Sequence, residues 1–462
     1  MFSAFITIKD VIFIKIIRDC LSIYKSVISN NIPKGEYTYR KISYIKIIEY
    51  KDKILAYNLL TDQLVEISKL EYSIIKNDQF NYNEILKELK ENYFIVPISF
   101  NDKKLADSLF RIYSSFYNKT KKAYTILPTT VCNARCYYCF ELNKEYHSMD
   151  TDMANNVAEF INKDSISNDI DIHWFGGEPL CNVKAIDIIC SKLKSLGKNI
   201  KSSMTTNGSL FTDDIVNKAI NLWNLKNVQI TLDGTKDVYN KIKAYANIYN
   251  AFEQVDKNIE RLLNNNVAVR VRLNVSLDNA EDLKQLCKYL ASKYKKNRLF
   301  SVYTFMVLNH RNNKPYIDYD KKCIINKMIE INDYLFDSGI GMRDILKRKY
   351  QPNFCMADND KHLVIYPNGK VGKCEYFISE NFIGDIYNNH LCTSISDDWK
   401  FLKKNKCNCS NCLHYPRCFE LDKCPNCFES CDEFDINLKD YLLEKRIINT
   451  YEKAIQKIEV GM

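Results

Sequence analysis

The chain has 462 residues, of which 46% are hydrophobic and 27% charged, a composition typical of a globular protein of roughly two to four domains. Lysine and arginine together number 66 and aspartate and glutamate 57, so the net charge is +9, an excess too mild to indicate nucleic-acid binding. The 18 cysteines, without a secretory signal, favour metal binding in a cytoplasmic protein over a disulfide framework.

The first segment, residues 1–36, begins with an apolar stretch that charged residues interrupt from Lys9 to Lys25. These charges exclude a transmembrane span. We interpret the segment as an amphipathic helix that packs on the protein, with a membrane-surface role as the alternative.

Residues 37–117 show a separate pattern of short strands followed by helices. The expected strands are 45–50, 54–59, 64–67 and 94–97, and the expected helices are 69–76, 83–92 and 102–116. Three strands followed by helices predict a small winged-helix-like domain.

Strands and helices alternate over residues 118–335. The expected strands are 124–130, 170–175, 200–206, 227–232, 268–275 and 299–306, with helices near 151–163, 183–196, 212–222, 249–264 and 281–294. Six such units predict an α/β fold with a parallel sheet and right-handed crossovers, here an open, partial (β/α)6 barrel.

Cys132, Cys136 and Cys139 follow the first of these strands at C-x3-C-x2-C spacing. The loop that leaves a barrel strand is where such folds keep their chemistry. Three thiolates can hold three corners of an iron–sulfur cube and leave the fourth iron open. A zinc site is the alternative, but it requires a fourth ligand, for which His147 is the one close candidate downstream.

Polar residues follow the other barrel strands. Gly176-Gly177-Glu178-Pro179 allows a close backbone approach and offers a carboxylate to an ammonium group. Alternation places Arg270, Arg272 and Asn274 on one face of their strand, which predicts a barrel interior lined for a ligand. The remaining strand ends supply hydroxyl groups from Thr205, Thr206 and Thr231.

The cysteine spacing, the aromatic Tyr138 before the last cysteine and the Gly-Gly-Glu-Pro stretch together resemble the radical S-adenosylmethionine (SAM) superfamily, over about residues 123–310. The resemblance implies a 4Fe-4S cluster whose open iron chelates SAM, and cleavage of SAM to a 5′-deoxyadenosyl radical that abstracts hydrogen. It further implies that Tyr138 contacts the adenine and Glu178 the methionine ammonium, and that Gly176 and Gly177 also border SAM. The implied contacts to ribose and carboxylate are Thr205, Thr206, Thr231 and Arg272.

Nine further cysteines lie between positions 355 and 431, more than one metal site requires. Their pattern resembles the SPASM extension of peptide-modifying radical SAM enzymes, which predicts an auxiliary iron–sulfur domain over residues 336–435. The resemblance implies one auxiliary 4Fe-4S cluster on Cys355, Cys374 and Cys424 and another on Cys409, Cys412, Cys418 and Cys431, with Cys427 and Cys407 as competing ligands. Two zinc sites are the alternative. The segment from Cys418 to Cys424 departs from the family, because it has five intervening residues instead of three.

Three further expectations concern substrate handling. Glu375, beside Cys374, is a candidate proton acceptor, with a solvated surface glutamate as the alternative. Residues 436–462 predict an amphipathic helix that packs on the body. The winged-helix-like domain resembles the PqqD-like peptide-recognition domain of peptide maturases, in which a leader segment adds as a strand to the sheet edge.

These features favour a radical SAM enzyme that modifies a ribosomally made precursor peptide, forming a thioether or another intramolecular cross-link. The implied partners are the precursor, bound through its leader, and an electron donor such as flavodoxin or ferredoxin. A sulfatase-type maturase that makes formylglycine and a non-catalytic iron–sulfur or zinc scaffold that binds peptides are the alternatives.

Overall fold

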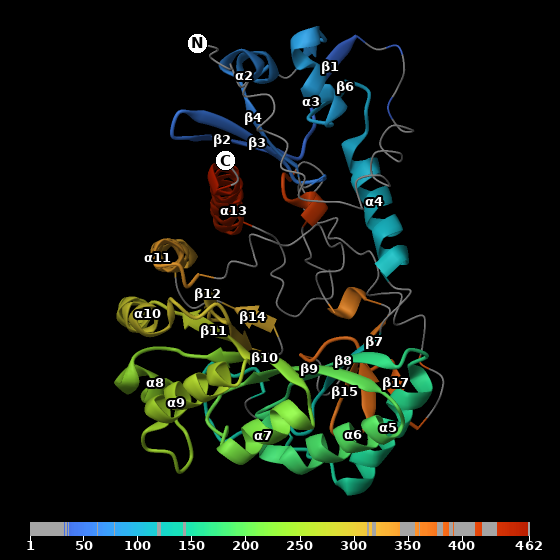
Figure 1. The fold of residues 1–462 in the computed structure, drawn as a ribbon, viewed down its shortest axis with the longest axis vertical. Helices are drawn as coiled ribbons and strands as arrows, with labels where there is room; N and C mark the ends of the chain where they lie inside the picture. Colours follow the sequence, from blue (N-terminus) through green and yellow to red (C-terminus); the bar gives the residue numbers. More distant parts are fainter. Residues whose placement is uncertain are drawn as a thin grey trace.

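The computed structural model describes residues 32, 35, 37–61, 63–77, 79–117, 122–141, 145–311, 314–316, 320–341, 356–359, 361–376, 382–387, 391, 412–417 and 432–460. Figure 1 shows a parallel-sheet body at the bottom of the view, a smaller α/β unit at the top and the C-terminal helix α13 between them. No helix among these residues is long and apolar enough to cross a membrane.

The N-terminal unit contains two antiparallel three-stranded sheets, ordered β2-β3-β4 and β5-β1-β6. Its strands are β1 (Thr38–Lys41), β2 (Ile45–Tyr50), β3 (Lys53–Asn58), β4 (Gln63–Ile67), β5 (Phe80–Asn81) and β6 (Ile95–Pro97), and its helices α2 (Lys69–Ile75), α3 (Lys87–Glu91) and α4 (Asp102–Tyr117). The expected strands and helices are confirmed. β1 and β5 were not predicted, because so few residues show no alternation.

The body is a partial barrel, as predicted. Its six parallel strands are β7 (Lys122–Ile126), β8 (Asp169–Trp174), β9 (Asn199–Thr206), β10 (Leu225–Thr231), β11 (Ala268–Val275) and β12 (Phe300–Met306). Its helices are α5 (Thr151–Asp164), α6 (Val183–Ser195), α7 (Asp213–Asn221), α8 (Lys236–Lys243), α9 (Ala251–Asn264) and α10 (Ala280–Tyr294). The first strand ends at Ile126, earlier than predicted, because Pro128 has no N–H for a ladder.

Alternation along the strands separates the core from the interior of the barrel. On β11, Val269, Val271 and Leu273 are buried in the main hydrophobic core with residues of the surrounding helices. Arg270 and Arg272 point to the opposite side and line a cavity. Ordinary barrels fill this interior with branched apolar side chains, so a polar interior indicates a place for a ligand.

The chain returns to the sheet after the barrel. β15 (His362–Ile365) pairs in parallel with β7, β16 (Lys370–Gly372) pairs antiparallel with β15, and β17 (Gly384–Asp385) pairs antiparallel with β16. The sequence Asn368-Gly369 is typical of a hairpin turn, and Gly369 joins β15 to β16 with φ of +78°, a conformation that glycine adopts without steric cost. A separate hairpin contains β13 (Asn309–Arg311) and β14 (Lys314–Tyr316).

Helix α13 (Glu433–Val460) joins the N-terminal unit to the barrel (Figure 1). Leu443 and Ile447 are buried in the core of the N-terminal unit. Tyr441 donates a hydrogen bond of 2.8 Å to Asp333 of α11 (Lys321–Asp337), the helix that packs on β12. The prediction of a C-terminal packing helix is therefore confirmed.

Candidate active site

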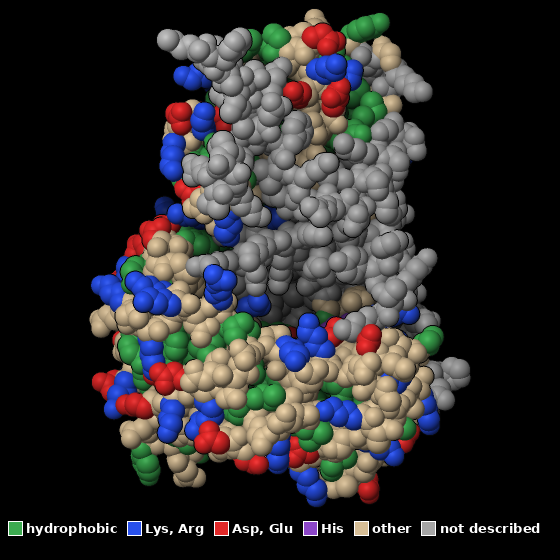
Figure 2. All heavy atoms as spheres, viewed as in Figure 1, with side chains coloured by type: hydrophobic (Ala, Val, Ile, Leu, Met, Phe, Trp, Pro, Cys, Tyr) green, Lys and Arg blue, Asp and Glu red, His purple; other side chains and the backbone are tan. Residues whose placement is uncertain are grey.

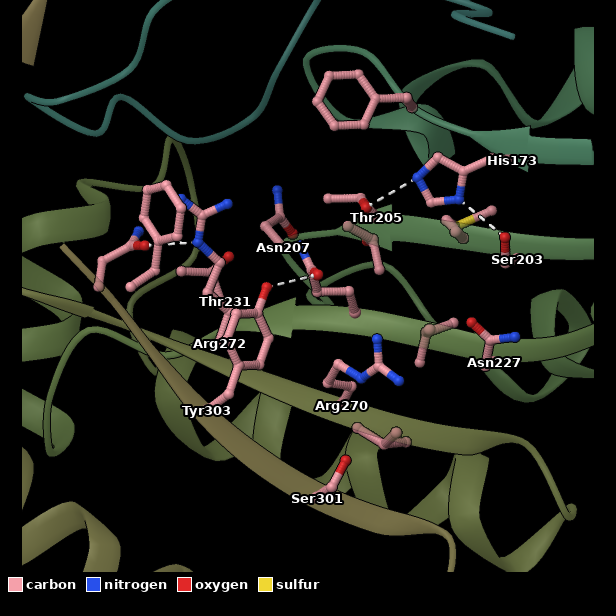
Figure 3. Close-up of a pocket in the computed structure, with 18 of the residues that line it drawn as sticks. His173, Ser203, Thr205, Asn207, Asn227, Thr231, Arg270, Arg272, Ser301 and Tyr303 are labelled. Carbon is pink, nitrogen blue, oxygen red and sulfur yellow. Dashed lines mark hydrogen bonds between the residues drawn. The ribbon is translucent and has the colours of Figure 1, made fainter. Parts of the chain in front are cut away.

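One cavity of about 1010 Å³ occupies the interior of the barrel. Figure 3 shows its wall, in which His173 of β8, Ser203 and Thr205 of β9, Asn227 and Thr231 of β10, Arg270 and Arg272 of β11, and Ser301 and Tyr303 of β12 face one another. The loop that carries Cys132, Cys136 and Cys139, called the cysteine loop below, contributes all three of these residues to the lining of the same cavity. The structure thus brings the predicted cysteines and the predicted polar strand ends to one place.

The cysteine loop leaves β7 and lies against the turn that follows β8. Gly177 N–H donates to Thr129 O at 3.2 Å, and Glu178 N–H donates to Val131 O at 2.9 Å. A Cβ on Gly177 would lie 2.6 Å from Val131 O, closer than real contacts allow. The two glycines therefore permit a backbone-to-backbone approach that positions the loop.

Burial raises the pKa of Cys132 to about 12 and that of Cys139 to about 11. These thiols stay protonated at neutral pH until iron displaces the proton, so insertion of a cluster releases protons.

The three cysteines of the loop are not arranged around a single metal ion. Among the described residues, no three His, Cys, Asp or Glu side chains are placed to hold a single metal ion. A cube takes one thiolate on each of three irons, so its cysteines need not converge on one point. His147, the candidate fourth zinc ligand, instead pairs its ring with Glu145 at 3.3 Å.

Glu178 is completely buried, and its carboxylate is already hydrogen-bonded within the chain. It accepts from Thr206 Oγ1 at 2.8 Å, from Asn207 N at 2.7 Å and from Leu180 N at 3.2 Å. Burial raises the pKa of Glu178 to about 6, against the opposing effect of these hydrogen bonds. The carboxylate thus ties the turn after β8 to the end of β9.

Other predicted SAM contacts lie in the wall of the cavity, where neighbouring side chains orient them. Thr205, Thr231 and Arg272 line the cavity, as does Tyr138. Arg272 Nε donates to Asn274 Oδ1 at 2.8 Å, and its guanidinium stacks 3.7 Å from the centre of the Phe305 ring. This contact orients the guanidinium while leaving it on the cavity wall.

Of the auxiliary cysteines, Cys374 and Cys412 belong to the described residues. Cys374 is buried directly after β16, while Cys412 packs against the core of the N-terminal unit. The remaining predicted ligands, Cys355, Cys409, Cys418, Cys424, Cys427 and Cys431, lie outside the part of the chain that the structure describes.

Glu375 lines the cavity. Burial raises its pKa to about 7, and its Oε2 has no hydrogen-bond partner among the described residues. Next to it, the Tyr376 ring stacks on Phe140, which follows the last cysteine of the loop, with 4.2 Å between ring centres. The cysteine loop and the segment after Cys374 therefore meet at the edge of the cavity.

His173 was not predicted as a site residue. Its ring lies in the cavity wall between Ser203 Oγ at 2.8 Å and Thr205 Oγ1 at 3.1 Å (Figure 3). Alternation in strand 169–174, where Ile170, Ile172 and Trp174 are apolar, was a signal that could have identified it as inward-facing.

Burial lowers the pKa of His173 from 6.5 to about 4, which predicts a loss of stability in acid. Below pH 6.5 the His173 ring is protonated in the unfolded chain, but in the folded chain it stays neutral until about pH 4. The free energy of unfolding therefore decreases as the pH falls through this window. We expect His173→Gln to abolish roughly 2–3 kcal/mol of this pH dependence, measured by denaturant unfolding from pH 7 to 4.5. His147→Gln, at a partly exposed ring, is the control; equal slopes in both variants would contradict the assignment.

Comparison with known proteins agrees with this geometry. The model of the radical SAM superfamily matches residues 126–290. Residues 126–290 therefore form a radical SAM domain, and this family implies a 4Fe-4S cluster and SAM as cofactors.

Two relatives extend the similarity beyond this domain. The radical SAM cyclopropyl synthase TigE of Paramaledivibacter caminithermalis is 24% identical over 396 residues, 78% of this chain and 79% of the relative. A cysteine-type anaerobic sulfatase-maturating enzyme of Clostridium novyi is 24% identical over 374 residues, 71% of this chain and 93% of the relative. The solved structure of anSMEcpe with bound AdoMet shares the fold, with a TM-score of 0.57 and 17% identity over 72% of this chain and 99% of the other.

Proposed function

We propose that this enzyme abstracts hydrogen from a ribosomally made precursor peptide and forms an intramolecular bond in it. The observation that best supports the proposal is a cavity in which the cysteine loop faces the polar interior of the barrel. Its volume of about 1010 Å³ lies at the upper end of the range for small-molecule sites, which leaves room for part of a peptide beside SAM. A cluster on Cys132, Cys136 and Cys139, with SAM bound, supplies the 5′-deoxyadenosyl radical that removes hydrogen from carbon.

The chain's own residues hold and orient SAM in this proposal. Tyr138 and the backbone of Gly176 and Gly177 border the space beside the cysteines, and Thr205, Thr231 and Arg272 offer hydroxyls and a cation for ribose and carboxylate. Glu178 and Thr206 are bonded to each other. Direct contact of Glu178 with the methionine ammonium requires the fully buried carboxylate to become accessible from the cavity; without that change it serves SAM by fixing the turn at Asn207.

One auxiliary cysteine, Cys374, lies beside the cavity that we propose for the substrate. The described Cys374 stands next to Glu375, and Glu375 faces the cavity. We propose that an auxiliary cluster on Cys355, Cys374 and Cys424 binds a substrate thiolate, while Glu375 accepts a proton during oxidation. A second cluster would use Cys409, Cys412, Cys418 and Cys431, with Cys427 as an alternative ligand.

Two kinds of bond are candidates for the product: a thioether and a carbon–carbon bond. A thioether suits a cluster that holds a thiolate, whereas the relative named as a cyclopropyl synthase supports carbon–carbon bond formation. The two differ in one chemical property of the product, since a thioether consumes a cysteine thiol and a cyclopropane does not.

A coexpression experiment tests the proposed function. The enzyme is produced with a short peptide encoded beside its gene, and the peptide is analysed by mass spectrometry before and after alkylation with iodoacetamide. We expect the peptide to lose two hydrogens, together with one alkylatable thiol if a thioether forms. An unmodified peptide, from enzyme that makes 5′-deoxyadenosine, would contradict the assigned substrate while leaving the radical chemistry intact.

A sulfatase-type maturase is the second candidate, favoured by the relative from Clostridium novyi. It predicts an aldehyde in place of a cysteine thiol, which hydrazide labelling of a cysteine-containing peptide would reveal. The N-terminal unit favours the precursor-peptide function, because its sheets offer edges to which a leader can add as a strand.

Removal of the N-terminal unit tests leader binding. We expect deletion of residues 1–117 to weaken affinity for the precursor at least tenfold while SAM cleavage continues. The deletion exposes the face of α13 that packs in this unit, so it is combined with Leu443→Gln and Ile447→Gln, and the full-length double variant is the control. Isothermal titration with the precursor measures the affinity; an unchanged value would remove the recognition assignment.

A further inference from the structure

Three side chains, two of them buried, connect the cysteine loop to the segment after β10. Tyr138, between the second and third cysteines, donates its hydroxyl to Asp233 Oδ2 at 2.6 Å. Lys243 Nζ, at the end of α8, pairs with the same oxygen at 3.0 Å and donates to the Tyr138 hydroxyl at 3.0 Å. Asp233 and Lys243 are 0% and 3% exposed, so this is an ion pair removed from water.

The backbone reinforces the same connection. Arg135 N donates to Lys243 O at 2.8 Å, and Ala246 N donates to Asn133 O at 2.9 Å. To make this turn, Ala244 adopts a left-handed conformation with φ of 42°, which costs a residue with a side chain about 1 kcal/mol. The loop that would hold the cluster is therefore hydrogen-bonded to the end of α8 and the residues after it, and the left-handed conformation of Ala244 is the cost of this contact.

Lys243 contacts the loop on both sides of the middle cysteine, through Arg135 N and the Tyr138 hydroxyl. Burial lowers the pKa of Lys243, but the carboxylate of Asp233 outweighs burial, and the net shift is well upward. The ammonium thus remains charged inside the protein, within electrostatic range of a cluster ligand. An uncompensated buried charge is strongly destabilising, which is why Asp233 accompanies it.

We propose that the Tyr138–Asp233–Lys243 triad is a positioning device that also sets the reduction potential of the SAM-binding cluster. Reduction adds one negative charge to the cluster, and a fixed cation close to a ligand favours the more negative state. Lys243 therefore makes the cluster easier to reduce. The hydroxyl of Tyr138 holds the loop against the pair. The inference rests on the cluster binding to Cys132, Cys136 and Cys139 in the proposed function.

A set of charge variants separates the electrostatic role from a structural one. Lys243→Met removes the cation, Asp233→Asn removes the anion, and the double variant removes both while avoiding an unpaired buried charge. Each full-length protein is reconstituted anaerobically with iron and sulfide, its iron is counted, and the potential of the cluster is titrated with dithionite by electron paramagnetic resonance, without SAM.

We expect reduction to be at least tenfold less favourable in Lys243→Met, which for one electron is about 59 mV. The double variant should also lie below the wild type, and Asp233→Asn should lie above it. Tyr138→Phe, which retains all charges, should leave the potential nearly unchanged but speed the loss of iron to a chelator several-fold.

The outcomes distinguish this inference from the proposed function. A wild-type protein that binds no cluster at its three cysteines would refute the proposed function itself. Intact clusters with equal potentials in wild type, Asp233→Asn and the double variant would overturn the electrostatic role. An unchanged rate of iron loss in Tyr138→Phe would overturn the positioning role.

Discussion

Cys136→Ala is expected to abolish formation of 5′-deoxyadenosine from SAM. Cys136 is the middle thiol of the cavity-lining loop, and a cube cannot be held at a site for three thiolates when one ligand is missing. Chromatography of the products, after incubation of the reconstituted enzyme with SAM and dithionite, measures the effect. We expect the rate to fall at least about 1000-fold, about 4 kcal/mol of activation free energy.

Cys323→Ala is the matched control for this variant. Cys323 is an exposed thiol on α11, outside the cavity, so its loss should leave both iron content and cleavage rate unchanged. Cleavage that persists in Cys136→Ala would show that the radical arises elsewhere in the chain. A loss of activity in both variants would point to general thiol damage instead.

Gly177→Ala is expected to destabilise the fold at the cysteine loop. The new Cβ would lie 2.6 Å from Val131 O and 2.8 Å from the Thr130 carbonyl carbon, and backbone atoms cannot move aside as a flexible side chain can. We expect a loss of about 3 kcal/mol or more, seen as a lower unfolding midpoint of the apoprotein. The reconstituted variant should also bind less iron, because the displaced backbone leads directly to Cys132.

Gly197→Ala controls for the backbone cost of replacing glycine. Gly197 has φ of +78° with no atom within 4 Å of a new Cβ. Its replacement should therefore lower the free energy of unfolding only by the left-handed strain, roughly 1–2 kcal/mol, and leave the iron content unchanged. Gly177 has no such φ, and its effect is therefore steric. If the two variants lost equal stability and kept equal iron, the close approach would not be what positions the loop.

The sequence predicted the parts of the fold that carry regular patterns. Residues 268–275 alternate without interruption, which was enough to place Arg270 and Arg272 on the inner side and the valines in the core. Asn368-Gly369 similarly predicted the hairpin between β15 and β16. Helix α8 was missed, because its eight residues are mostly charged and polar and show too little apolar periodicity.

Site residues that depend on long-range contacts could not be predicted in the same way. Lys243 is separated by 105 residues from the Tyr138 hydroxyl that it contacts, and its short helix resembles any exposed charged segment. The internal hydrogen bonds of Glu178 likewise follow from the meeting of two loops, which no local pattern records. Motif spacing predicted the metal ligands, whereas the contacts that position the cysteine loop became visible only in the packed structure.

In the proposed active site, one iron is left without a protein thiol and binds SAM at the cysteine loop. Electron paramagnetic resonance of the reduced, anaerobically reconstituted enzyme, recorded with and without SAM, tests it most directly. A Cys374→Ala/Cys412→Ala variant reduces overlap from auxiliary clusters. We predict a 4Fe-4S signal whose shape changes when SAM is added and which disappears in Cys136→Ala. A signal indifferent to SAM, or zinc in place of the cube, would contradict the account.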